Sequence, residues 1–184
     1  MNRRYDVRLA TVDDTDAIAM VHVLTWQTSY RGLIPDGLLD SLAIEPRAEY
    51  WRRTIARADP AHPVWVATID DHVVGFTDAG PSRDPDANPA IGELYAIYVL
   101  AEYQGRGIGQ ALLGVAASWL AQRYRSATLW VLESNERSRR FYELSGWRFD
   151  GTLKREALGS FILSEARYRI DFRAPGEIGA STHK

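Results

Sequence analysis

The sequence predicts a single α/β domain in which helices cover both faces of one mixed sheet. Three observations predict it. β-rich apolar runs occur in seven places along the 184 residues, helical patterns interrupt them in groups, and no composition change divides the chain into two parts. Helices that interrupt runs of strands in this way pack on both faces of a mixed sheet, and the length suits one domain of ordinary size.

The first half of the chain predicts a strand, two helices and a hairpin, over residues 5–10, 11–30, 47–58, 64–70 and 72–80. Thr11 can cap the first helix, and the aspartates that follow it favour the positive end of the helix. We expect a loop with a short helical turn between the two helices. The pair Asp70–Asp71 separates the two β-rich runs, which predicts a hairpin turn there.

The second half predicts strand, helix, strand, short helix and a closing antiparallel pair, over residues 92–99, 108–124, 126–132, 135–146, 147–155 and 160–172. The strand at 92–99 is largely apolar on both faces, so we expect it to be central and covered on both sides. Gly146 is expected to stop the short helix. We expect the domain to span residues 1–172 and the polar, Gly-rich tail 173–184 to be disordered.

Composition excludes several classes of function. The formal net charge is −2, which gives no sign of a nucleic-acid partner or of an anionic membrane. Cysteine is absent, so disulfides, thiol catalysis and cysteine-ligated metals are excluded. The four histidines show no metal-ligand spacing, and we expect His22, on an apolar helix, to be structural. Without a signal peptide or a long apolar run, the expectation is a cytoplasmic protein that needs no metal.

A glycine-rich loop, "QGRGIG" at residues 104–109, stands between the strand at 92–99 and the next helix. A helix start leaves N–H groups without partners and carries partial positive charge, which suits an anion. Gly105, Gly107 and Gly109 let phosphate approach the backbone, and Gln104 and Arg106 can add donors. The loop therefore predicts a diphosphate site.

Two other phosphate loops fit less well. A Walker loop needs Gly-Lys-Ser or Gly-Lys-Thr, which is absent. A dinucleotide loop has two residues before its third glycine, whereas here the glycines alternate. Glu133 ends the next strand, where a ribose-binding acid could lie, but it is 28 residues past Gly105 (133 − 105) instead of about 20. A nicotinamide-dependent oxidoreductase therefore stays open as an alternative function, although the glycine spacing disfavours it.

Two sequence blocks together resemble one known family. Gln104, Gly107 and Gly109 meet the pattern Gln or Arg, two residues, Gly, one residue, then Gly or Ala. "NERSRRFYELSGW", from Asn135 to Trp147, matches the second conserved block and supplies a Phe-Tyr pair and a glycine. In order and separation these blocks resemble the GNAT superfamily of acetyl-CoA-dependent N-acetyltransferases. The clear resemblance covers residues 92–149.

The resemblance implies a mostly antiparallel mixed sheet of about seven strands in which the strands at 92–99 and 126–132 splay apart. The pantetheine arm of acetyl-CoA would enter that gap like an added strand, beside a bulge in the first strand. The diphosphate would lie on the N–H groups of the glycine loop. The resemblance assigns to the coenzyme the residues Ile97, Tyr98, Val99, Gln104, Gly105, Arg106, Gly107, Ile108, Gly109, Gln110, Asn135 and Ser138.

The implied chemistry needs a base and an acid. An alkyl amine has a pKa of about 10.4, so it must lose a proton before it attacks the thioester, and a departing thiolate of pKa about 8.5 benefits from an acid. Tyr142 matches the family tyrosine that can reach the sulfur; the alternative is that it only packs, as we expect of Phe141. Glu93, the one charged residue of its strand, is the candidate base; the alternatives are a water chain, or a Glu93 that faces solvent.

The resemblance implies that the segment after the first strand forms the acceptor pocket. Trp26 and Tyr30 are four residues apart, so they share a helix face and could hold an amine by cation–π contact, unless both belong to the core. Glu93 could also contact the acceptor. We expect a small primary amine, such as a polyamine, amino acid, antibiotic or peptide amine, and possible homodimers. A non-catalytic acyl-CoA sensor is the second alternative.

Overall fold

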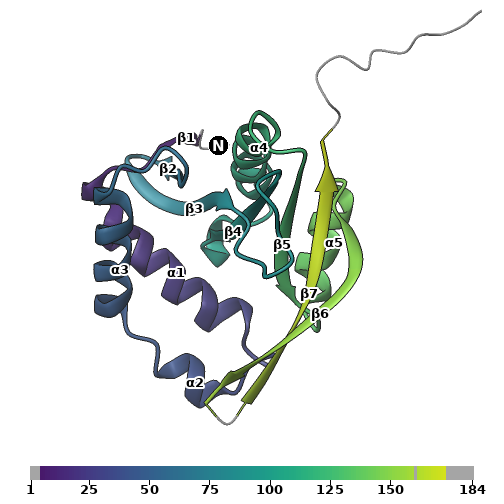
Figure 1. Cartoon of the computed structure of the whole chain (residues 1–184). Coiled ribbons are helices and arrows are strands. Elements are labelled where there is room, and N and C mark those ends of the chain that lie inside the picture. Colours follow the sequence, from purple (N-terminus) through teal and green to yellow (C-terminus); the bar gives the residue numbers. More distant parts are fainter. Residues whose placement is uncertain (1–4, 160, 173–184) are drawn as a thin grey trace, which may run out of the picture.

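The computed structural model describes residues 5–159 and 161–172, so the expected tail 173–184 lies outside the described residues. Its strands form one seven-stranded sheet in the order β1-β2-β3-β4-β5-β7-β6 (Figure 1). The elements are β1 (Asp6–Leu9), α1 (Thr15–Ser29), α2 (Asp36–Asp40), α3 (Ile44–Ala56), β2 (Val64–Ile69), β3 (His72–Pro81), β4 (Ile91–Val99), α4 (Ile108–Ala121), β5 (Ser126–Leu132), α5 (Glu136–Leu144), β6 (Arg148–Leu158) and β7 (Phe161–Asp171).

The element order and the mixed sheet predicted from the sequence are confirmed. Every neighbouring pair of strands is antiparallel except β4 and β5, which run parallel. Several boundaries differ by a few residues. α3 begins at Ile44, because Pro46 is tolerated in a first helical turn, and β6 continues to Leu158, because its pairing with β7 extends that far.

Helices cover the two faces of the sheet, as Figure 1 shows. α1 and α3 pack on one face through a core that includes Ile18, Trp51 and Phe76. On the other face, α4 and α5 pack on a core that includes Leu112 and Tyr168. Below we call the first the α1 face and the second the α4 face.

The hairpin between β2 and β3 turns through the two aspartates that the sequence singles out. Asp70 and Asp71 have φ of 48° and 63°. Two consecutive left-handed residues are typical of the tight hairpin turn whose twist matches that of the flanking strands. Gly146, with φ of 88°, follows α5 in the left-handed conformation that ends helices.

β4 carries the two irregularities that shape the site. Between the pairs Asp78–Ala96 and Ala79–Leu94, β4 has one extra residue, Tyr95, which is a β-bulge. Pairing with β5 extends only from Ile91 to Leu94. Beyond that point the two strands separate, so the expected splay and bulge are both present.

Candidate active site

The glycine loop leads directly into the first turn of α4 (Ile108–Ala121). Gln104 and Gly105 form a turn with φ of −67° and 75°, and Gly107 caps α4 with φ of 85°. The first helical bond runs from the Ala111 N–H to the Gly107 carbonyl at 3.0 Å. Within residues 5–159 and 161–172, the N–H groups of residues 107–110 have no hydrogen-bond partner. Four such donors at the positive end of a helix dipole are suited to bind an anion.

The gap between β4 and β5 presents backbone groups that the sheet does not use. The Leu100 N–H donates to the Val74 carbonyl on β3 at 3.0 Å. Along an antiparallel strand these bonds alternate, so the backbone groups of Ile97 and Val99 point the other way, toward β5. Since β5 pairs with β4 only as far as Leu94, Ile97 and Val99 lie on an open strand edge.

Tyr142 on α5 has a buried side chain and a hydroxyl that makes no hydrogen bond within the described part of the chain. Burial, together with the nearby hydroxyl of Tyr98, raises the pKa of Tyr142 above its ordinary value of 10. A tyrosine with a raised pKa stays protonated at neutral pH. The hydroxyl therefore carries its hydrogen at neutral pH and can donate it in a hydrogen bond.

Trp26 and Tyr30 come from the end of α1 and meet the same Tyr98. The Trp26 indole N–H donates to the Tyr98 hydroxyl at 2.9 Å. The rings of Trp26 and Tyr30 meet edge to face at 5.0 Å. Burial raises the pKa of Tyr30, and the nearby Tyr98 and Tyr142 hydroxyls raise it further. Three tyrosine hydroxyls thus come together: those of Tyr30, which follows α1, Tyr98 of β4 and Tyr142 of α5.

The comparisons with known proteins agree with this geometry. The model of the acetyltransferase (GNAT) family matches residues 18–147. The chain belongs to the GNAT family. The uncharacterized N-acetyltransferase YuaI of Bacillus subtilis (strain 168) is 38% identical over 131 residues, which cover 70% of this chain and 72% of that protein. This GNAT protein is an acyltransferase.

Solved structures show the same fold. The PaiA N-acetyltransferase of Thermoplasma acidophilum, in complex with coenzyme A, has a TM-score of 0.75 and 20% identity and covers 92% of this chain and 99% of that one. The yncA structure from Salmonella typhimurium, with its cofactor acetyl-CoA, has a TM-score of 0.68 and 18% identity, covering 96% and 98%. The resemblance of the two sequence blocks to the GNAT superfamily is confirmed.

Glu93, the candidate base of this GNAT chain, is 2% exposed and already bound. The Arg83 main-chain N–H donates to its Oε2 at 2.8 Å, and the Arg83 guanidinium donates to its Oε1 at 2.6 and 3.2 Å. The alternative of a solvent-facing Glu93 is therefore wrong. The carboxylate anchors the connection between β3 and β4.

Several predicted coenzyme residues also have structural partners. The Gln104 side chain donates to the Val99 carbonyl at 2.8 Å and fixes the loop against β4. The Arg106 guanidinium donates to the Glu102 carbonyl at 2.8 Å. The side-chain amide oxygen Oδ1 of Asn135 caps α5 by accepting the Ser138 N–H at 3.0 Å. These contacts shape the loop and the helix start, and none of them uses the N–H groups of residues 107–110.

The sequence reasoning missed polar residues that β5, β6 and β7 present on the α1 face. Trp130, Lys154 and Glu165 meet there: Lys154 pairs with Glu165 and lies over the Trp130 ring. Arg167 lies next to them and binds three aspartates. Only the alternation of charged residues along 161–171 signals this face in the sequence, and the partners on other strands cannot be read from it.

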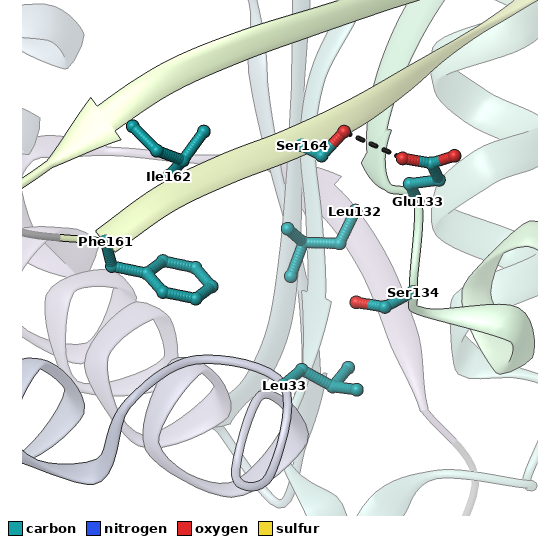
Figure 2. A pocket seen from close by; sticks show the side chains of 7 residues that line it. All are labelled: Leu33, Leu132, Glu133, Ser134, Phe161, Ile162 and Ser164. Carbon is teal, nitrogen blue, oxygen red and sulfur yellow. Dashed lines mark hydrogen bonds between the residues drawn. The ribbon is translucent and has the colours of Figure 1, made fainter.

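A hollow of about 220 Å³ lies where β5 ends and the β6–β7 hairpin passes the α1–α2 connection (Figure 2). Its lining is mainly apolar and includes Leu33, Leu132 and Phe161. At its edge the Ser164 hydroxyl donates to Glu133 at 2.7 Å, the dashed line of Figure 2. Glu133 therefore belongs to the lining of this hollow.

In the part of the chain that the structure describes, no group of three or more His, Cys, Asp or Glu side chains could hold a metal ion. Within the same residues, no helix is long and apolar enough to cross a membrane.

Proposed function

We propose that this GNAT protein transfers the acetyl group of acetyl-CoA to the primary amino group of a small molecule by direct attack on the thioester. The observation that carries the proposal is the set of four N–H groups at residues 107–110, which have no hydrogen-bond partner in the part of the chain that the structure describes. A diphosphate fits such donors, and the open edge of β4 suits an extended pantetheine arm.

The acid in this proposal is Tyr142. The amine nitrogen bonds to the carbonyl carbon, the C–S bond breaks, and the leaving sulfur takes the proton of the Tyr142 hydroxyl. The nitrogen gives its second proton to water as it becomes the amide nitrogen, and water returns a proton to the Tyr142 oxygen. That hydroxyl has no partner among the described residues, and its raised pKa keeps it protonated. A backbone N–H at the Tyr95 bulge is a suitable donor for the oxyanion that forms on the carbonyl oxygen.

The proton that the ammonium loses before it attacks leaves through water in this proposal. Glu93 already accepts three hydrogen bonds from Arg83, which supports an anchoring role for it. The aromatic wall of Trp26, Tyr30 and Tyr98 is suited to hold the acceptor, because aromatic faces attract ammonium groups.

The test is a thiol-release screen with acetyl-CoA over polyamines, amino acids, aminoglycosides and peptide amines. We expect release of coenzyme A with at least one acceptor class, and a thermal shift with acetyl-CoA alone. A thermal shift without release on any amine would favour a non-catalytic acyl-CoA sensor. No shift at millimolar acetyl-CoA, with a shift on NADH, would favour the oxidoreductase.

A further inference from the structure

Lys154 on β6 places its ammonium group between a carboxylate and an aromatic face. Its Nζ is 2.9 Å from the Glu165 carboxylate and 4.6 Å from the centre of the Trp130 ring. A longer ion pair, at 3.9 Å, joins it to Glu156. The side chain of Glu165 is 18% exposed and that of Lys154 is 41% exposed. A carboxylate beside an indole face is a favourable place for an organic cation.

This place adjoins the aromatic wall of the candidate active site. The Glu165 charge helps to raise the pKa of Tyr30 and of Tyr98, so its carboxylate lies near both hydroxyls. Glu165 is also the β7 residue opposite Leu132 of β5. Leu132 packs with Trp26 and Tyr30 in one apolar cluster. Glu165 therefore faces the cleft that the acceptor would enter.

The neighbouring cation does not neutralise Glu165. Arg167 also lies near the Trp130 ring, at 5.7 Å, but its guanidinium is paired with Asp84, Asp86 and Asp150 at 2.7–3.2 Å. Its side chain is 11% exposed, so three carboxylates already take up its charge away from solvent. Lys154, in contrast, has a flexible stem and a compact charge that another cation can replace.

We propose that Glu165 and Trp130 form a subsite for a second positive charge of the acceptor, and that Lys154 fills it until the acceptor displaces it. The acceptor class is then a diamine or an amine with a guanidinium group. One amino group enters the β4–β5 gap, and the other cation takes the place of the Lys154 ammonium. This inference rests on the proposed function, because it concerns the acceptor of that same reaction.

The first experiment compares α,ω-diaminoalkanes with 1-aminoalkanes of equal length. For the native sequence we expect kcat/KM of the best diamine to be at least tenfold higher than that of the monoamine of equal length. Glu165→Gln removes this preference and leaves kcat/KM for the monoamine within about twofold. Lys154→Met lowers KM for the diamine several-fold, and a gain in affinity cannot come from misfolding. Arg155→Gln is the matched control, since Arg155 is exposed and points to the opposite face of β6.

The second experiment measures binding without turnover. Calorimetric titration of the same diamine and monoamine into protein saturated with coenzyme A reports the subsite directly. Tighter diamine binding that Glu165→Gln abolishes supports the subsite even if no thiol is released, in which case the proposed function fails alone. The subsite is overturned if thiol is released but the diamine and the monoamine have equal dissociation constants in the native protein and in all three variants. In that case the proposed function stays intact.

Discussion

The Arg83 guanidinium lies 2.6 Å from the Glu93 carboxylate, a buried acid on the central strand β4. Removing one partner leaves the other without its main hydrogen bonds. We expect Arg83→Met and Glu93→Gln each to lower the free energy of unfolding by about 1–2 kcal/mol, since the arginine is 60% exposed and solvent weakens the pair. Urea unfolding measures the free energy of unfolding of each variant. The double variant should lose less unfolding free energy than the two single variants lose together.

Glu93→Gln also tests the role of Glu93 in the reaction. If the carboxylate only anchors the β3–β4 connection, kcat per folded molecule should fall less than tenfold in Glu93→Gln. A loss of about 100-fold or more with unchanged stability would instead make Glu93 the base, because general bases contribute about 10²–10⁴-fold.

Tyr142→Phe removes the hydroxyl that we propose as the acid for the leaving sulfur. We expect kcat to fall by about 10²-fold or more, with the dissociation constant of acetyl-CoA unchanged. Stability should not fall, because this hydroxyl has no hydrogen-bond partner among residues 5–159 and 161–172. Steady-state kinetics and calorimetry separate the two effects. Turnover equal to that of the native sequence would remove Tyr142 from the mechanism.

Gly107→Ala tests the anion site at the start of α4. Gly107 has φ of 85°. An alanine that keeps this left-handed conformation lowers the free energy of unfolding by about 1–2 kcal/mol, and otherwise the loop changes conformation. We expect acetyl-CoA to bind at least tenfold more weakly. The control is Gly114→Ala in the same helix, where an added Cβ meets nothing within 4 Å. It should add about 0.5–1 kcal/mol of stability and leave binding unchanged. Equal acetyl-CoA affinity in both variants would contradict the anion site.

His22 makes the fold sensitive to acid. Burial, and to a smaller extent the charge of Arg47, lowers the pKa of His22 to about 3, whereas an unfolded histidine titrates near 6.5. Above pH 6.5 the histidine is neutral in both the folded and the unfolded chain, and the unfolding free energy has its full value. As pH falls from 6.5 toward 3, the unfolded chain binds a proton at this histidine and the folded chain does not, so the unfolding free energy decreases. By pH 4 the loss is about 3 kcal/mol.

Urea unfolding at pH 7 and at pH 4 measures this dependence. His22→Leu should show a smaller fall in unfolding free energy between the two pH values than the native sequence. His72→Leu, at the exposed β2–β3 turn, should leave the fall unchanged. An identical fall in all three proteins would show that His22 is not the group that titrates.

The local features of the fold were predictable because each depends on few neighbouring residues. The Asp70–Asp71 turn and the Gly107 cap need left-handed backbone, which their residue types allow. The strand at 92–99 is apolar on both faces and is indeed central in the sheet. Boundaries such as the end of β6 were missed, because pairing with β7 determines them.

The sequence by itself determined the order of the elements, the glycine loop and its helix start, and the two blocks of the GNAT family, since periodicity and spacing along the chain encode these. Only the tertiary structure decided what the side chains contact. Trp26 meets Tyr98 from 72 residues away, Arg83 binds Glu93, and Lys154 meets Glu165 and Trp130. Strand order and register bring these residues together. Because β7 lies between β5 and β6 in the assembled sheet, side chains from all three strands meet on one face.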